Sequence, residues 1–118
     1  MKKMYFLYVE IYVFGSNAKG IHNGGQAKDA LLNHGAISGR GIGLQGTSYA
    51  IPTKRSLYET MPLSEVREHV LEFIKFARSH SEFTFEVQRI GCGNAGFTDD
   101  DMKPLFKNSP ENVHLHFR

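Results

Sequence analysis

The hydrophobic positions along this chain alternate between the spacing of strands and the spacing of helices. Runs rich in aromatic and β-branched residues, or apolar at every second position, predict strands over residues 5–14, 48–53, 83–90 and 113–117. Between them, apolar residues recur at helical intervals and predict helices over residues 26–34, from Pro62 to Ala77, and over 99–106. This alternation predicts an α/β protein whose mainly parallel sheet is covered by helices.

Residues at the ends of these segments have the chemistry of helix caps. We expect Gly35 to be the C-cap of the first helix, Ser64 the N-cap of the second and Thr98 the N-cap of the third. Residues 36–47 are predicted to form a glycine-rich loop, and residues 54–61 to be irregular.

Composition and charge exclude several classes of function. The 118 residues are 41% hydrophobic and 22% charged, which is typical of one globular domain spanning residues 1–118. The net charge of +2 is too small to indicate a nucleic-acid or membrane partner, and no apolar stretch approaches the ~20 residues that span a bilayer. The basic and apolar start resembles a signal peptide, but Glu10 interrupts it and no small-residue cleavage site follows, so we interpret it as a strand.

The single cysteine and the scattered histidines argue against a metal centre. Cys92 alone excludes an internal disulfide and favours a reducing, cytoplasmic setting. His114 and His116 share a face of the last predicted strand, but the sequence offers no third ligand. We therefore expect no metal and no cofactor.

All twelve glycines lie in two stretches. Nine fall between Gly15 and Gly46, and three lie in the segment Arg89–Phe97. Both stretches begin where a predicted strand ends, and ligands of open α/β sheets bind at the carboxyl ends of parallel strands. Their amides, with the N-terminus of the first helix, are suited to hold a pyrophosphate; alternatively, both are ordinary strand-to-helix turns. The chain has no P-loop motif and no strict dinucleotide-binding glycine motif after the first strand.

Four segments of the sequence resemble macrodomains. Residues 14–17 and 23–30 resemble the asparagine, glycine run and helix that follow the first strand of that family. Residues 89–93 (Arg-Ile-Gly-Cys-Gly) are similar to the phosphate loop of macrodomains related to terminal ADP-ribose protein glycohydrolases, and residues 49–54 to the strand of that group that ends in Thr-Lys. The resemblance covers roughly residues 9–106 and extends to small macrodomain-like proteins of bacteria and their phages. It implies a compact three-layer macrodomain-like fold, with a mainly parallel mixed sheet between helices.

The resemblance also implies a ligand and a set of residues that bind it. The ligand is ADP-ribose or a related NAD-derived nucleotide, free or attached to an ADP-ribosylated macromolecule. Asn17 matches the asparagine near the distal ribose. The other residues that match lie in the glycine stretches: Gly24, Gly25, Gly91, Cys92, Gly93, Asn94, Ala95 and Gly96, with Phe97 at the end of the second stretch. Independently of the resemblance, we expect His22, in the first glycine loop, and Gln26, at the start of the first helix, to contact the ligand.

Two residues bear on whether the ligand is only bound or is also hydrolysed. Lys54 matches the lysine that attacks the distal ribose in hydrolytic relatives, or else it forms a solvated pair with Arg55. Ala95 occupies the position of the aspartate that assists that lysine, which favours a binding module over a hydrolase. The alternative is a hydrolase that uses Lys54, or a water held by Asn17 and His22. His22 is otherwise part of a solvated loop, and we expect Cys92 to pack against or line the site.

Overall fold

The computed structural model describes residues 9–118, in which one mixed sheet of six strands runs in the order β2-β3-β1-β5-β6, with β4 paired to β3. β1 pairs in parallel with β3 and β5, and β5 in parallel with β6, whereas β2 and β4 are antiparallel to β3. The strands are β1 (Val9–Asn17), β2 (Gly43–Gln45), β3 (Ser48–Ser56), β4 (Glu59–Thr60), β5 (Phe83–Val87) and β6 (Val113–Leu115). The helices are α1 (Gly25–Asn33), α2 (Leu63–Arg78) and α3 (Asp99–Met102), which continues into a 3-10 turn, η1 (Lys103–Phe106).

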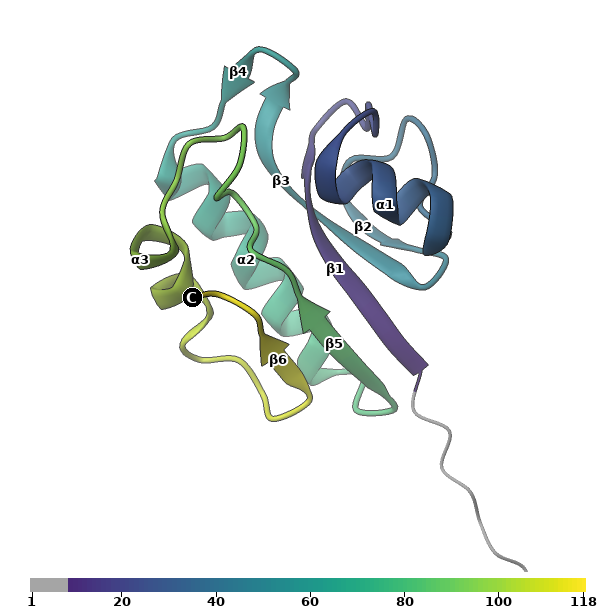
Figure 1. Cartoon of the computed structure of the whole chain (residues 1–118). Helices are drawn as coiled ribbons and strands as arrows, with labels where there is room; N and C mark the ends of the chain where they lie inside the picture. The colour runs from purple at the N-terminus through teal and green to yellow at the C-terminus, as the bar shows by residue number, and fades with distance from the viewer. Residues whose placement is uncertain (1–8) are drawn as a thin grey trace, which may run out of the picture.

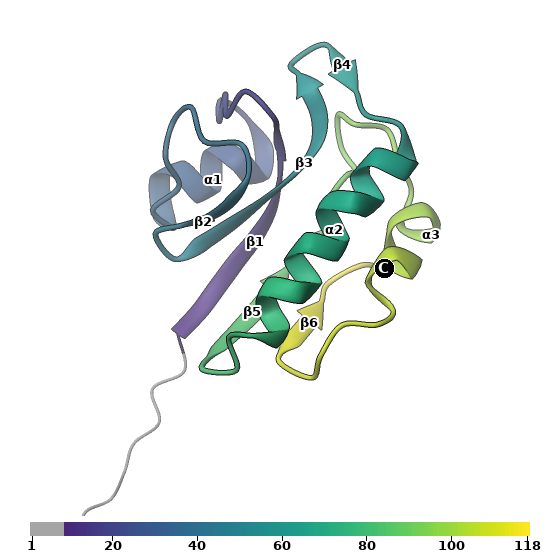
Figure 2. The ribbon, with the colours of Figure 1, turned by 180° about the vertical axis from the view of Figure 1, so that it is seen from behind.

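The helices cover both faces of the sheet and make three layers. In Figure 1, α1 lies beside β1 and in front of β2, and α2 is in front when the molecule is turned around in Figure 2. Each layer has its own apolar cluster. The α1 side buries Phe14, Ala27, Ala30, Ala36 and Ala50. The α2 side is larger and centres on Phe73. The centroid of its ring lies 5.1 Å from that of Tyr49 and 5.4 Å from that of Phe85.

The central position of β1 explains why its sequence is apolar almost throughout. Neighbouring residues of β1 point to opposite faces, so Val13 enters the α2 side while Phe14 enters the α1 side. Both residues are fully buried. The α/β class, the mainly parallel sheet and the helices on both faces are confirmed.

Several expected boundaries are wrong. β1 continues beyond Phe14 to Asn17, because Gly15 and Ser16 still pair with β3. Its expected start at residues 5–8 lies outside the described residues. The third expected strand ends at Val87 instead of continuing to residue 90.

Two segments expected to lack regular structure are strands. Residues 54–61, expected to be irregular, hold the end of β3 and the whole of β4, which form an antiparallel hairpin. Gly43–Gln45, expected to be loop, is β2, which pairs with the other edge of β3. β2 and β4 are short and mainly polar, so their own sequence pattern does not predict strands. They are strands because they pair with β3.

Of the three expected helix caps, Thr98 is confirmed, Gly35 lies one residue beyond the cap and Ser64 is wrong. The C-cap of α1 is His34, and Gly35 comes directly after it with a positive φ of 73°, a conformation that glycine adopts at little cost. At α3, the Thr98 hydroxyl accepts from the Asp101 amide, and the Asp101 carboxylate accepts from the Thr98 amide, which completes a capping box. Ser64 is not an N-cap, because α2 begins one residue earlier, at Leu63, and Pro62 holds the cap position without a side-chain bond. Among residues 9–118, no helix combines the length and the hydropathy needed to cross a bilayer.

Candidate functional site

The two glycine stretches meet in one cleft at the carboxyl ends of the parallel strands. The cleft has a volume of about 290 Å³. One wall is the end of β1 and the start of α1, from Gly24 to Ala27, and the facing wall is the loop after β5, with Gly91 and residues 93–95. Lys54 of β3 lies in the same lining. The structure thus brings together residues that are more than 60 positions apart in the sequence.

Residues with unpaired main-chain N–H groups line both walls. The amides of Gly25, Gln26 and Ala27 open α1, where they have no acceptor within the helix and where no side chain caps them. In the facing loop, the amides of Gly91, Gly93 and Ala95 donate to no residue in the range 9–118. Free amides at a helix start and in a glycine loop attract anions. The cleft is therefore suited to a phosphate or diphosphate.

Two glycines of the cleft are not required by the fold itself. Gly24 has an extended backbone with φ of −163°, and a Cβ added to it meets no atom within 4 Å. A Cβ on Gly93 also enters open space, and its φ is not positive. Gly41 is different, because a Cβ there would lie 2.1 Å from the Asn17 carbonyl oxygen. Gly24 and Gly93 thus leave space that a ligand can occupy against the main chain.

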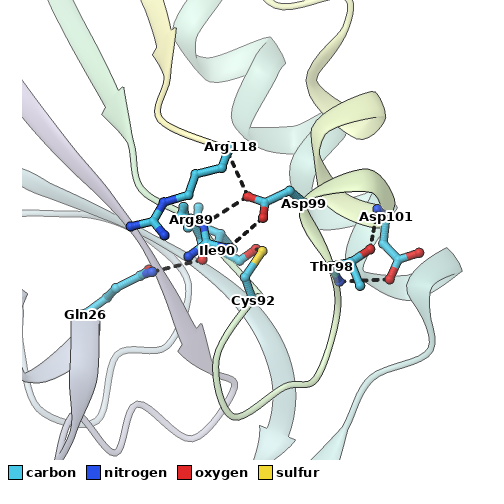
Figure 3. A network of polar contacts seen from close by, with 8 residues as sticks. All are labelled: Gln26, Arg89, Ile90, Cys92, Thr98, Asp99, Asp101 and Arg118. Carbon is cyan, nitrogen blue, oxygen red and sulfur yellow. Dashed lines mark hydrogen bonds and ion pairs between the residues drawn. The ribbon is translucent and has the colours of Figure 1, made fainter.

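Gln26 holds the two walls together. Its side-chain oxygen accepts from the Gly15 amide at 2.9 Å, and its side-chain nitrogen donates to the Arg89 carbonyl at 3.0 Å. Figure 3 shows the second of these bonds reaching from α1 to the loop. Both ends of the side-chain amide are engaged, so Gln26 sets the spacing of the walls in addition to lining the cleft.

Asn17 is buried at the end of β1 and shapes the loop that follows it. Its side-chain nitrogen donates to the Ile21 carbonyl at 2.9 Å, and its oxygen accepts from the Ile21 amide at 3.0 Å. This pair of bonds closes a turn and fixes the side chain at the border of the cleft. One amide hydrogen and one lone pair remain for a ligand.

Lys54 is half-buried, and its position depends on the hairpin of β3 and β4. Its ammonium nitrogen donates to the Leu57 carbonyl at 2.6 Å, within the turn of that hairpin. The hairpin also contacts the opposite loop, because the Thr60 hydroxyl donates to the Ala95 carbonyl at 3.3 Å. Lys54 and Ala95 therefore belong to the same end of the cleft.

The carboxylates that follow the loop are turned away from the cleft. Asp99 accepts two bonds from the Arg89 guanidinium, at 3.0 and 2.6 Å, and one from the Arg118 amide (Figure 3). The Arg89 bonds, followed by the Arg118 bond, hold the pKa of Asp99 far below its usual value. Asp101 is engaged in the capping box. Among the described residues, none of those lining the cleft is an aspartate or glutamate.

Four of the expected site residues lie outside the cleft lining. His22 is buried against the edge of the Phe14 ring, and its Nε2 lies 2.9 Å from the Arg40 carbonyl. Phe97 packs beneath Gly91 on the core, and Gly96 closes the turn of the loop. Cys92 is turned toward a neighbouring hollow, and burial, followed by the charge of Asp99, raises its thiol pKa, which disfavours a thiolate nucleophile.

The cleft also includes residues that sequence reasoning did not select. Ile21 and Leu57 add apolar surface near Lys54, and Thr53 and Ser16 add hydroxyls. Leu57 is brought there by the unexpected hairpin, so no local pattern indicates it. Ile21 lies within the first glycine stretch, and the sequence signal for it is that it is an isolated apolar residue in a polar loop.

Neither a metal-binding cluster nor a match to a known protein accompanies the cleft within the described residues. Within residues 9–118, no three histidine, cysteine or acidic side chains are grouped so that they could hold a metal ion. No protein-family model matches the chain, and no curated protein or solved structure is significantly similar to it.

Proposed function

We propose that this protein binds ADP-ribose or a related NAD-derived nucleotide in the cleft, as a reader or signal-binding module with a macrodomain-like fold. The main support is that residues with unpaired amides lie on two facing walls, at the start of α1 and at Gly91, Gly93 and Ala95. A diphosphate between these walls accepts hydrogen bonds from both. The distal ribose then lies toward Asn17 and Lys54, and we expect the protein to act in the cytoplasm.

The lining of the cleft favours binding over hydrolysis. Ala95 stands in the loop where the resemblance implies an acid, and Asp99 is held by Arg89 instead of facing the ligand. Among the described residues, the cleft thus has no carboxylate to take a proton from Lys54 or from water.

One observation supports a second candidate, an ADP-ribosyl hydrolase. Lys54 lines the cleft, at the end assigned to the distal ribose. The amine of Lys54 is a nucleophile only when it is deprotonated. A neutral amine still carries N–H hydrogens, so it can keep the hydrogen bond to the Leu57 carbonyl.

Calorimetry tests the binding proposal directly. Titration with ADP-ribose, NAD and ADP is expected to give a saturable heat with ADP-ribose, and the absence of binding by all three at millimolar concentration contradicts the proposal. Incubation with a mono-ADP-ribosylated protein then separates the two candidates. Release of ADP-ribose that is lost in Lys54→Ala, but kept in Lys75→Ala on the exposed surface of α2, identifies a hydrolase; no release identifies a binding module.

A further inference from the structure

A second hollow of about 410 Å³ adjoins the cleft. It is lined by Gln26, Gln88, Arg89, Cys92, Gly93, His116 and Arg118. Gln26 and Gly93 line both spaces, so they form the border between them. A ligand that leaves the cleft over this border enters the hollow.

The hollow is lined by basic and neutral side chains. Two of its residues are arginines and one is a histidine, while none of its residues within the described chain is acidic. Two carboxylates that contact residues of the hollow already have partners. Asp99 is held by Arg89 and by the Arg118 amide, and Glu86 accepts from His114 and His116, which lie 2.6 and 3.0 Å from its oxygens.

Donors that face the hollow remain free. The Arg118 guanidinium has no hydrogen-bond or ion-pair partner among residues 9–118, and in Figure 3 its side chain extends past Arg89 toward the side of Gln26. Arg89 uses Nε and Nη2 on Asp99, which leaves its Nη1 donors. A guanidinium fork matches a phosphate with two parallel hydrogen bonds.

We propose that this hollow is an oxyanion subsite that continues the cleft, and that the preferred nucleotide carries a phosphate monoester beyond its diphosphate. The inference rests on the proposed function. With the distal ribose at Asn17 and the diphosphate between the walls, the second ribose crosses the border at Gln26 and Gly93. A 2′-phosphate on that ribose then meets Arg118, the type of contact with which an arginine accommodates the 2′-phosphate of NADP in other dinucleotide sites.

The test compares ADP-ribose with 2′-phospho-ADP-ribose by calorimetry. The phosphorylated ligand is expected to bind about tenfold more tightly, because charge-assisted bonds from an arginine are among the stronger hydrogen bonds. Arg118→Gln is expected to remove most of this gain and to leave the affinity for ADP-ribose unchanged. Arg118→Lys keeps the charge without the fork and is expected to retain part of the gain. Arg67→Gln, an equivalent change on the exposed surface of α2, is the control and is expected to have no effect.

Two results overturn the subsite while leaving the proposed function intact. One is equal affinity for the two ligands. The other is an equal loss for both ligands in Arg118→Gln, which indicates general attraction instead of a specific contact. Failure of ADP-ribose itself to bind contradicts the proposed function, and the subsite inference then falls with it.

Discussion

At the scale of single residues, the glycines of this chain have two distinct roles. Gly41 is needed where backbone segments meet, because a side chain there would overlap the Asn17 carbonyl. A Cβ added to Gly24 or Gly93 would meet no atom within 4 Å, and both have backbone conformations that other residues adopt. The physical reason to keep glycine at these two positions is the approach of a ligand to the main chain.

Substitution by alanine separates these roles. In Gly93→Ala and Gly24→Ala, we expect the free energy of unfolding to stay within about 1 kcal/mol of the parent, because alanine fits the native backbone and restricts the unfolded chain. Affinity for ADP-ribose is expected to fall at least about tenfold, because the new methyl group occupies the ligand's place. Gly41→Ala is expected to lower stability markedly. Thermal denaturation and calorimetry measure both quantities, and full affinity in Gly93→Ala contradicts the assigned cleft.

Asp99 gives stability a dependence on pH. Its pKa is lowered in the folded state, so its contribution is complete above the unfolded pKa of about 4 and is lost as the pH falls toward the folded value. We therefore expect Asp99→Asn to be less stable than the parent near neutral pH, and the difference to shrink on acidification below about pH 4. Urea unfolding across pH measures this difference, with Asp100→Asn, an exposed neighbour, as the control. A difference that grows on acidification is the opposite of this expectation.

At the scale of elements, pairing partners decide what short segments become. β2 and β4 contain three and two residues, and each is a strand because it pairs with β3. β3 itself is mostly buried, and it continues to Ser56, beyond the expected end at residue 53. The hairpin that β3 forms with β4 then places Lys54 and Leu57 in the cleft.

The helix starts provide a matched pair of substitutions. Thr98→Ala removes the hydroxyl of the capping box at α3, and we expect a loss of about 1 kcal/mol in the free energy of unfolding. Ser64→Ala is expected to change it by less than about 0.5 kcal/mol, because Ser64 is exposed inside α2 and caps nothing. Denaturant unfolding compares the two variants. Equal losses contradict the observed boundary of α2.

At the scale of the whole molecule, the cleft depends on the docking of α1 against the loop after β5. Parallel pairing of β1 with β5 brings the two regions to the same edge of the sheet. Gln26 then joins Gly15 to Arg89 across this junction. The separation of the two walls is therefore a property of the assembled sheet and of one glutamine.

Gln26→Leu tests this junction. It keeps the approximate size of the side chain but leaves the Gly15 amide and the Arg89 carbonyl without their partner, so we expect a loss of about 1–3 kcal/mol in the free energy of unfolding. Affinity for ADP-ribose is expected to fall as well, because the walls are no longer held at a fixed spacing. Gln88→Leu is the control, since within residues 9–118 the Gln88 side chain bonds only to the nearby Glu86 carbonyl. Equal effects of the two changes show that Gln26 does not act as the bridge.

The sequence alone determined the α/β class, the central strand β1 and the amphipathic α2, because apolar periodicity and turn residues are local signals. It also indicated that Gly24, Gly25, Gly93 and Lys54 lie at the carboxyl edge of the sheet, where the structure brings them together.

Only the tertiary structure decided the short strands β2 and β4, the burial of His22, and the turn of Cys92 toward the hollow. It also engaged Asp99 with Arg89 and left the Arg118 guanidinium beside a second hollow. These outcomes depend on contacts between residues far apart in the sequence. A local sequence pattern indicates the secondary structure that a segment prefers, but it does not indicate which distant residues the segment will contact.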